Sequence, residues 1–552
     1  MGIKNLSFAV FLLAAFLLIS PILTGCGQES TVEPSSSGAS VGETIAGKIT
    51  VVDSESITLA LGIIQTSSGT TSDSTPSAVP DDASDCITFQ ENGNSQTVSV
   101  TDFTAITIKD SESVLSSDEL AVGDVVEVIL DSTGTNSLSI VIYSAEGDES
   151  TGKIALDGVK AIHGASATLN NANYSSTQSN QNVILVTASG SLVLSDSSVT
   201  KSGDTTSEDE SNFYGLNAAV TAADSSTLTI NSSNITTNAE GSNAVFSTGE
   251  NTVIRIADLV INTLGNSSRG LDATYGGTII AQNVTITTSG VHCAALATDR
   301  GGGTISVTSG TLNTSGDDSP CLYSTGTINA SHVTGNADDS PCMVIEGKNS
   351  ITLENSTLNG AGKNGVMLYQ STSEDAEEGT SVLTVTDSTL GTKSSGAMFY
   401  VTNTDAAVQL TNSRLNFPSG VLIEAAGNDT NNWGTPGSNG GNLTMTAKTQ
   451  SLTGNVICDS ISSVVLSLQN STFSGAIDSK NQGSVSLSLD EKSTWAVTAD
   501  SFLSSLANAD QTLSNIQSNG FTIYYDSANS ANNWLSGQTY SLTGGGFLKP
   551  LQ

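Results

Sequence analysis

The sequence predicts an all-β protein in which a small antiparallel β-barrel precedes a right-handed parallel β-helix of about thirteen turns. The first reason is composition. Of 552 residues, 53 are glycine, 13% are charged and 5% are aromatic, and serine, threonine and asparagine recur throughout. Residues of these kinds favour short strands and tight turns. The second reason is a repeat of about 23 to 26 residues, which is typical of solenoids.

The charge of the chain limits its partners. It carries 54 acidic and 17 basic residues, which gives a net charge of −37 at pH 7. Nucleic acid binding needs a basic face that neutralises phosphates, and the sequence encodes no such face. We therefore expect no nucleic acid partner, and we expect polyanionic substrates to be repelled.

Residues 1–25 predict a signal peptide. Lys4 precedes an apolar stretch from Leu6 to Ile22, and Leu23-Thr24-Gly25-Cys26 follows. This ending resembles the lipobox of bacterial lipoproteins, which implies cleavage before Cys26 and a diacylglycerol thioether on its sulfur. An uncleaved transmembrane helix is the alternative, but the apolar stretch is short for a membrane span. The resemblance implies an extracytoplasmic protein anchored by lipid, with residues 26–43 as a polar, flexible tether.

Residues 44–150 predict the small barrel. Apolar and polar positions alternate in short segments such as Val125–Leu130, separated by Gly, Asp and Ser. The segment Leu115–Val126, with its Gly-Asp-Val-Val turn, resembles an OB-like module of exported bacterial proteins that has no known function. Because it lacks a basic or aromatic platform for nucleic acid, we interpret it as a spacer or interaction module. Residues 66–85 form a polar insertion within it.

Residues 151–494 contain the repeat in two separate columns. One column is the first apolar residue of a short strand, and the other is a small residue that opens a second strand. The first column is Ala167, Leu192, Leu228, Ile254, Ile279, Ile305, Ile328, Ile351, Leu383, Val408, Leu443, Leu466 and Leu487. The second is Ala218, Ala244, Gly270, Cys293, Cys321, Cys342, Gly365, Ala397 and Gly420. Two columns with one period predict parallel strands stacked around a continuous core.

Corners are predicted after the first strand of each repeat. The motif is Asn or Asp, then Ser, any residue and an apolar residue, as in Asn355-Ser356-Thr357-Leu358. Asx and Ser side chains bond to nearby backbone groups and so fix tight turns. Polar insertions lengthen three of the repeats, near residues 203–211, 371–379 and 428–441.

The solenoid resembles adhesin-type and autotransporter passenger β-helices of the pectin-lyase-like kind. The resemblance is one of pattern and carries no diagnostic catalytic motif. We expect the lipid at Cys26 to do the anchoring that a membrane barrel does in autotransporters. Residues 495–552 are expected to cap the solenoid, with Trp495 and Trp534 sealing its apolar end and a short helix over Ser501–Ala507.

Three cysteines fall in the small-residue column: Cys293, Cys321 and Cys342. We interpret them as small buried residues on successive turns. Neighbouring in-register parallel strands do not readily give disulfide geometry, and His292 is the only imidazole nearby for a zinc site.

Four carboxylates raise the possibility of a cation site. Asp317-Asp318 and Asp338-Asp339 lie 21 residues apart, in the same phase before Cys321 and Cys342. Stacked at one corner, they would repel one another unless a cation screened them, and calcium prefers such oxygens. The alternatives are therefore a Ca²⁺ site and a solvated acidic corner.

A second row of side chains follows the small column and points away from the core. Its candidate ligand-binding residues are Phe246, Asp272, Tyr323 and Phe399, with Asp299 and Arg300 beside Asp272. Either the insertions bury this row, or it is an exposed stripe that marks a binding surface.

These features favour a cell-surface, lipid-anchored protein that is adhesin-like or binds glycans and has no catalytic activity. Its expected partners are the membrane, through the lipid, and a cell-wall or host glycan or a surface protein. The alternatives are a polysaccharide lyase or hydrolase of the β-helix type, for which Asp272, Asp299 and Arg300 are the best candidates, and a structural spacer in the envelope.

Overall fold

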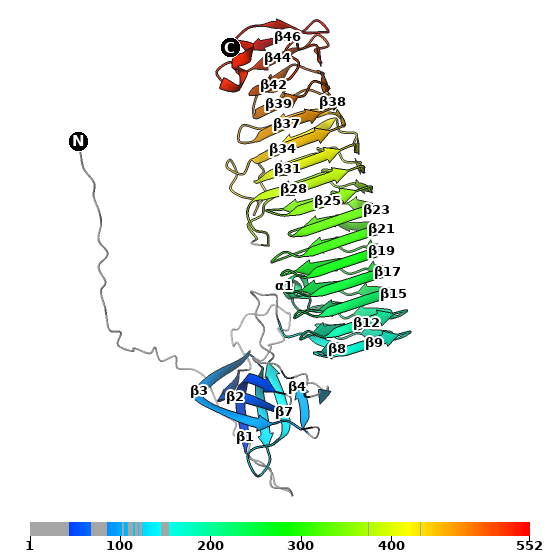
Figure 1. Ribbon diagram of the computed structural model, residues 1–552, viewed down its shortest axis with the longest axis vertical. Coiled ribbons are helices and arrows are strands. Elements are labelled where there is room, and N and C mark those ends of the chain that lie inside the picture. Colours follow the sequence, from blue (N-terminus) through cyan, green and yellow to red (C-terminus); the bar gives the residue numbers. More distant parts are fainter. Residues whose placement is uncertain are drawn as a thin grey trace, which may run out of the picture.

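In the computed structural model, the described residues are 43–53, 55–67, 86–101, 104–108, 114–115, 117, 120, 124–144, 154–373, 375–430 and 432–551. The signal peptide, Cys26 and the rest of the tether up to residue 42 lie outside these residues, as do residues 68–85. Strands make up 57% of the structure and helices 3%. The predicted all-β class is confirmed, and its main body is a parallel β-solenoid (Figure 1).

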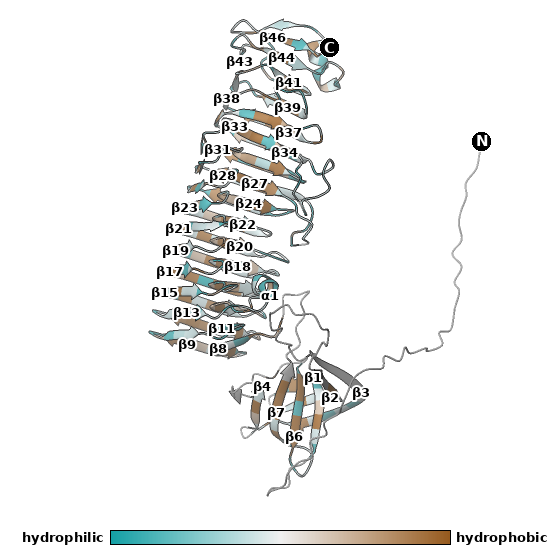
Figure 2. Ribbon diagram, turned by 180° about the vertical axis from the view of Figure 1, so that it is seen from behind, coloured by the Kyte–Doolittle hydropathy of each residue, from teal (hydrophilic) through white to brown (hydrophobic). Residues whose placement is uncertain are grey.

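A seven-stranded sheet forms the N-terminal module, in the order β3-β2-β1-β6-β7-β4-β5. Its neighbours pair antiparallel except β4 and β7, which are parallel. Alternate side chains, including Ile49, Leu59, Val98, Val128 and Ile140, form a separate buried core (Figure 2). The strands are β1 (Thr44–Asp53), β2 (Ser56–Ser67), β3 (Cys86–Ser99), β4 (Ala105–Ile108), β5 (Val114–Leu115), β6 (Val125–Leu130) and β7 (Ser137–Ser144).

Two long parallel sheets form most of the solenoid, and we name them the narrow sheet and the wide sheet. The narrow sheet has 12 strands. They are β8 (Asp157–His163), β11 (Gln181–Thr187), β14 (Val220–Ala222), β16 (Val245–Thr248), β18 (Leu271–Thr274), β20 (Leu296–Thr298), β22 (Leu322–Ser324), β24 (Met343–Glu346), β27 (Val366–Tyr369), β30 (Phe399–Thr402), β33 (Val421–Ala425) and β36 (Asn455–Cys458).

The wide sheet has 19 strands, several of which bend around a corner and pair on both sides of it. They are β9 (Ser166–Asn170), β10 (Asn173–Ser176), β12 (Ser191–Ser195), β13 (Ser198–Ser202), β15 (Thr227–Asn238), β17 (Val253–Thr263), β19 (Thr278–Thr288), β21 (Thr304–Asp317), β23 (Thr327–Asp339), β25 (Ser350–Glu354), β26 (Thr357–Gly360), β28 (Thr380–Thr386), β29 (Thr389–Thr392), β31 (Thr404–Thr411), β32 (Arg414–Asn416), β34 (Gly441–Lys448), β37 (Ser463–Gln469), β39 (Ser484–Leu489) and β42 (Ser505–Asn508).

Two four-stranded sheets complete the C-terminal turns. One contains β35 (Ser451–Thr453), β38 (Thr472–Ser474), β40 (Thr494–Ala496) and β43 (Ile516–Gln517). The other contains β41 (Ser501–Leu503), β44 (Thr522–Tyr525), β45 (Tyr540–Ser541) and β46 (Phe547–Pro550). The helical elements described here are α1 (Glu208–Tyr214) and the 3-10 helix η3 (Ser530–Leu535).

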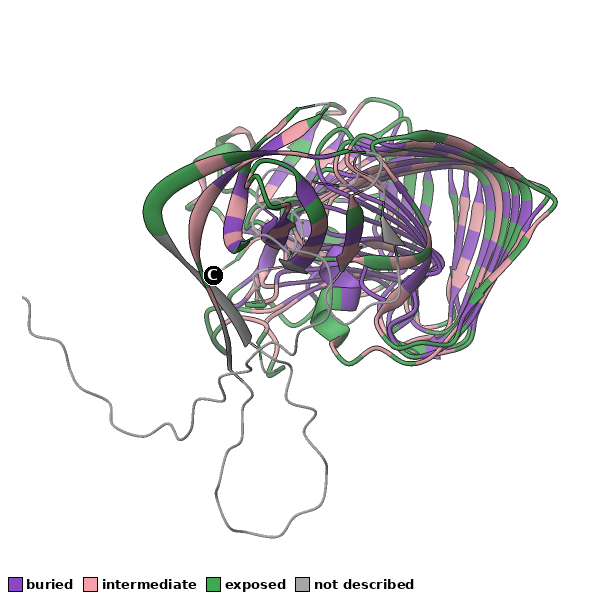
Figure 3. Ribbon diagram, turned by 90° about the horizontal axis from the view of Figure 1, so that it is seen from below, coloured by how far each residue is buried: buried purple, intermediate pink, exposed green. Residues whose placement is uncertain are grey.

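The first predicted column is the core of the wide sheet. Its members stand opposite one another, for example Leu228, Ile254 and Ile279, and all are buried except Ala167, which is partly buried. The exception to this register is Leu443, because Val408 pairs with Met445, two residues further on. A shift of two keeps the same face of a strand, so Leu443 is still buried. Seen from below, the buried residues gather inside the solenoid (Figure 3).

The Asx-Ser motif makes the corner of the wide sheet. Asn355 adopts the left-handed conformation (φ 47°), which asparagine tolerates better than most residues. The Ser356 hydroxyl donates to the Glu354 carbonyl at 2.6 Å and accepts from the Val333 N–H at 3.0 Å. The Ser388 hydroxyl accepts from the Ser356 N–H in the same way. Each serine therefore fixes its own corner and satisfies a buried N–H of the previous turn.

The solenoid has about 16 turns, where the sequence predicted thirteen. The reason is that parallel pairing continues beyond residue 494, through β42, β44 and β46. The helix predicted over Ser501–Ala507 is wrong, because these residues form β41 and the start of β42 around a corner. The helical turn of this region is η3 instead. Trp495 and Tyr525 are fully buried in the core.

Cys293 does not belong to the small-residue column. Leu296 stands opposite Leu322, so the residue opposite Cys321 is Ala295. Cys321 and Cys342 are neighbours, since Leu322 pairs with Met343. All three are buried free thiols, as predicted for small core residues.

Within the described residues, no helix is long and apolar enough to span a membrane.

Candidate functional site

The outward row of the narrow sheet is the first candidate site. Strand register places Phe246, Asp272, Ala297, Tyr323 and Val344 one above the other. Phe399 is not part of this row. It stands opposite Val366 and is fully buried in the core, so the prediction that Phe399 binds a ligand is wrong. The 371–379 insertion hid a one-residue shift in register, and such a shift exchanges the two faces of a strand.

The chain's own insertions cover the first part of this row. Helix α1 begins at its Ser207 cap, whose hydroxyl accepts from the Glu210 N–H, and ends at Gly215 in the left-handed conformation. A side chain at Gly215 would collide with the ring of Phe246, so this insertion lies directly on the row. Phe246 is fully buried as a result. Of the two alternatives predicted for the row, burial under insertions is confirmed here.

Arg269 lies under this cover with two carboxylates. Its Nη2 is 3.0 Å from Oδ2 of Asp299, and its Nε is 3.6 Å from Oδ2 of Asp272. Its Nη1 donates to Oδ1 of Asn212, which belongs to α1. The Asp272 side chain is 0% exposed and that of Asp299 is 4%. One guanidinium thus joins the insertion to two turns of the narrow sheet.

Burial controls the ionisation of this cluster. It raises the pKa of Asp299 to about 6 and that of Asp272 well above its usual range, although Arg269 opposes both shifts. Burial disfavours the charge on Arg269, but Asp299 and Asp272 raise its pKa. Two carboxylates share one cation, so the arrangement is neutral when Asp272 holds a proton. The cluster is closed to solvent, and it holds the fold together at this point.

Arg300 joins two insertions that are far apart in sequence. Its Nη2 and Nε donate to Oδ1 of Asp375, at 2.8 and 3.2 Å, and Asp375 lies in the 371–379 insertion. Its guanidinium carbon is 3.8 Å from the centre of the Phe213 ring, which belongs to α1. Arg300 therefore already makes internal contacts with both insertions, and its ligand-binding role stays a prediction.

Tyr323 is likewise engaged within the protein. Its hydroxyl donates to Oε2 of Glu346 at 2.7 Å, and the Tyr369 hydroxyl donates to the same oxygen at 2.8 Å. The Ser371 N–H donates to the other carboxylate oxygen at 3.1 Å. Burial and the nearby Glu346 charge raise the pKa of both tyrosines well above 10. The Trp433 ring, from the 428–441 insertion, packs on Tyr369 with the ring centres 4.8 Å apart.

A hollow of about 620 Å³ lies beside the 371–379 insertion. Its lining includes Asp375, Glu377 and Glu378. Asp375 is already held by Arg300, and Glu377 pairs with Lys348 at 3.1 Å. Two of the three carboxylates therefore serve to attach the insertion.

The acidic corner does not gather its four carboxylates. The ladder is irregular between Thr314 and Asp317, so Asp317 stands opposite Asp339 and not Asp338. All four side chains are exposed, and Asp318 lies 3.8 Å from Nε2 of His292. Across the described chain, no group of three or more His, Cys, Asp or Glu side chains is placed to hold a metal ion. The solvated corner, and not the Ca²⁺ site, agrees with this geometry.

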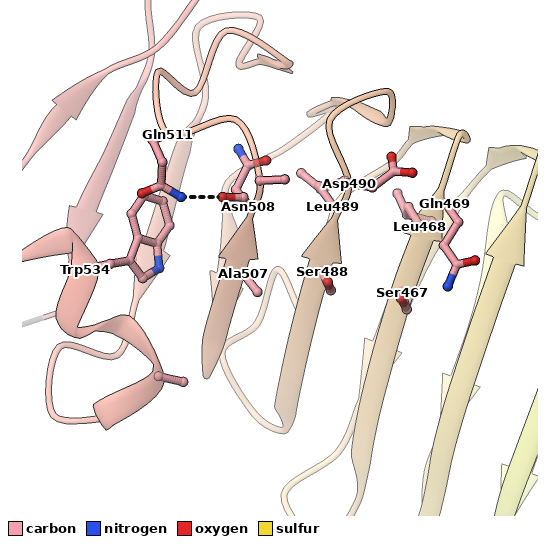
Figure 4. A pocket seen from close by; sticks show the side chains of 12 residues that line it. Ser467, Leu468, Gln469, Ser488, Leu489, Asp490, Ala507, Asn508, Gln511 and Trp534 are labelled. Atoms are coloured by element: carbon pink, nitrogen blue, oxygen red, sulfur yellow. Dashed lines mark hydrogen bonds between the residues drawn. The ribbon is translucent and has the colours of Figure 1, made fainter.

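An open groove lies across the wide sheet near its C-terminal end (Figure 4). Its volume is about 530 Å³. Ser467, Ser488 and Ala507 stand opposite one another on adjacent strands and form its floor. Trp534, from η3, closes one end, and its Nε1 donates to the Leu506 carbonyl at 2.9 Å. We name this hollow the Trp534 groove.

Amides and one carboxylate line the side of the Trp534 groove. Gln469 and Asn508 end two of the floor strands, and Asp490 and Gln511 follow strand ends (Figure 4). Nε2 of Gln511 donates to the Asn508 carbonyl at 2.6 Å. The sequence predicted Trp534 only as part of a cap. Its place on a helical turn that follows a run of serine-rich strands is the one signal that could have indicated a groove.

Comparison of the chain with protein-family models, with curated proteins and with solved structures returned no match.

Proposed function

We propose that this protein is an extracytoplasmic lipoprotein, anchored through Cys26, whose solenoid binds glycans or surface proteins without cleaving them. The Trp534 groove is the observation that carries this proposal. It is open and almost uncharged, it combines hydroxyl and amide groups with apolar side chains, and an aromatic ring closes one end. Such a combination suits a ligand rich in hydroxyl groups, because amides bond to hydroxyls and an indole ring packs on apolar faces.

Other parts of the proposal come from the sequence. Residues 1–25 would be removed and residues 26–43 would hold the folded part away from the membrane. The N-terminal sheet would be the OB-like module, acting as a spacer or interaction module. The solenoid would belong with adhesin-type or pectin-lyase-like β-helices. The many hydroxyl and amide side chains on the outer faces support a role at a cell surface.

A glycan-cleaving enzyme is the second candidate. The raised pKa of Asp299 favours it, because a carboxyl that titrates at about 6 can serve as a general acid. The closed surroundings of Asp272 and Asp299 disfavour it, since a substrate would have to displace Asn212 and Arg269 to reach them.

A binding screen combined with a cleavage assay separates these candidates. The full-length chain in detergent is tested on a glycan array and, in parallel, for release of reducing ends from pectin, alginate and chitin. We expect binding to at least one glycan and release from none. Reducing ends that appear with the wild type and disappear with Asp272→Ala would overturn the proposal in favour of the enzyme. Absence of binding to any glycan or surface protein would leave the spacer.

A further inference from the structure

The shape of the Trp534 groove restricts the direction of a ligand. Its floor consists of side chains in strict register on β37, β39 and β42, so it crosses the strands and runs along the axis of the solenoid. Adjacent strands are about 4.8 Å apart, so equivalent positions recur at that interval. A linear chain of similar units can therefore make the same contact at each turn.

The polar groups of the groove suit neutral hydroxyls. The hydroxyls of Ser467 and Ser488 and the Gln469 amide make no hydrogen bond to another residue in the described chain, so they are available to a ligand. Asp490 is the one ionisable side chain in the lining. Its oxygens already accept from the Ser493 hydroxyl at 2.6 Å and from the Asn470 N–H at 2.9 Å.

Charge excludes acidic ligands. No Lys or Arg lines the groove, and the chain as a whole carries a net charge of −37. An acidic polysaccharide would meet repulsion with no compensating ion pair. Although partial burial opposes ionisation, hydrogen bonds from Ser493 and from backbone N–H groups lower the pKa of Asp490, so this carboxylate stays charged at neutral pH.

We propose that the Trp534 groove binds a neutral glycan chain that lies along the solenoid axis, with one sugar ring against the indole of Trp534. This inference rests on the proposed function and gives it a site and a ligand class. The hydrogen bond from Trp534 to Leu506 fixes the plane of the ring before a ligand arrives, which reduces the entropy lost on binding.

The experiment measures binding of the full-length chain to neutral glucans, mannans and chitin oligosaccharides, and to the acidic glycans pectate and alginate. Ser488→Trp fills the floor from the outer face of β39 and leaves the core untouched. Thr352→Trp places the same bulk on the outer face of β25, away from the groove, and is the matched control. Trp534→Ala removes the indole. Far-ultraviolet circular dichroism and thermal melting check that each variant folds.

We expect a neutral glycan to bind, with at least tenfold weaker binding in Ser488→Trp and in Trp534→Ala and no change in Thr352→Trp. Neutral-glycan binding that survives Ser488→Trp unchanged would overturn this site while the proposed function stands. Binding of acidic glycans alone would overturn the ligand class. If no glycan binds, both this inference and the glycan-binding function fail.

Discussion

The insertion-covered part of the narrow sheet and the Trp534 groove are both outward faces of one solenoid, yet they carry opposite chemistry. The first contains Arg269, Asp272 and Asp299, all buried under α1. The second is open, and its lining combines hydroxyls, amides and apolar side chains with a single carboxylate. In a stack of parallel strands, like charges would recur about every 4.8 Å and repel, so a charged face needs exact pairing. On the narrow sheet Arg269 pairs with Asp272 and Asp299, and α1 covers the three residues and accepts one hydrogen bond from Arg269 through Asn212. No ion pair of this kind lines the Trp534 groove.

We name the part of the narrow sheet around Arg269, Asp272 and Asp299 the covered face. We infer that the stability of the protein depends on the covered face, whereas ligand binding depends on the Trp534 groove. Each prediction below tests this division, beginning with the largest expected effect.

Arg269→Met is expected to destabilise the protein most. It removes the one cation between Asp299 and Asp272 and leaves two buried carboxyls and Asn212 without their partner. Breaking a buried ion pair from one side costs about 3–5 kcal/mol. Chemical denaturation measures the loss. Arg414→Met is the control, since Arg414 is exposed on β32, and it should change the free energy of unfolding by less than about 0.5 kcal/mol. A loss below about 1 kcal/mol for Arg269→Met would show that the cluster is not structural.

The covered face is also expected to make stability depend on pH. The pKa of Asp299 is about 6 in the folded protein, above the unfolded value of about 3.9. Between these values the folded state holds a proton that the unfolded state has lost. The contribution of Asp299 is therefore fully present below about pH 4 and is lost as the pH rises through about 6, with a slope of at most about 1.4 kcal/mol per pH unit.

The measurement is the difference in unfolding free energy between the wild type and Asp299→Asn from pH 4 to pH 7. Taking the difference cancels the titration of the many exposed carboxylates. We expect the wild type to lose more stability than the variant across this range. Parallel pH profiles would mean that Asp299 ionises normally, and the covered face would then be open to water.

Arg300 provides a smaller effect that tests whether the insertions support each other. Asp375 and Phe213 both contact its guanidinium, one by hydrogen bonds and the other through its ring. A double-mutant cycle with Phe213→Leu and Asp375→Asn should give a coupling energy of about 0.5–1 kcal/mol, although these two side chains belong to different insertions. The same cycle in an Arg300→Met background should give none. Strict additivity in the wild-type background would mean that each insertion is held separately.

The sequence predicted the strand columns and corners of the solenoid, but it predicted neither the Arg269 cluster nor the Trp534 groove. Strand columns and corners follow from periodicity, so Leu228, Ile254 and Ile279 could be placed correctly. Periodicity cannot fix register across an insertion, and Phe399 was therefore assigned to the wrong face. The cover that α1 places over Arg269, Asp272 and Asp299 requires α1 to fold back over the sheet, and no local pattern encodes that contact. The Trp534 groove arises from η3 packing against distant strands, which is equally non-local.

The substitution Cys293→Ser gives the smallest predicted effect, and this residue tests the register most directly. Its Sγ accepts from the Ser268 N–H at 3.1 Å and donates to the Val291 carbonyl at 3.2 Å, while its own N–H donates to the Ser319 hydroxyl at 2.9 Å. The thiol therefore occupies a position that serine fills on the adjacent turns. Burial raises the pKa of Cys293 to about 11, so it remains a neutral donor and acceptor.

Cys293→Ser should change the free energy of unfolding by less than about 0.5 kcal/mol, because a hydroxyl can make both bonds. Cys293→Ala should cost about 1–2 kcal/mol, since the buried Ser268 N–H loses its acceptor. A residue chosen only for small size would behave in the opposite way, with alanine tolerated and serine destabilising. Denaturation of the two variants side by side distinguishes these cases. The order of the two variants in stability, and not the size of either change, decides whether Cys293 takes the hydrogen-bonding position that serine fills on the adjacent turns.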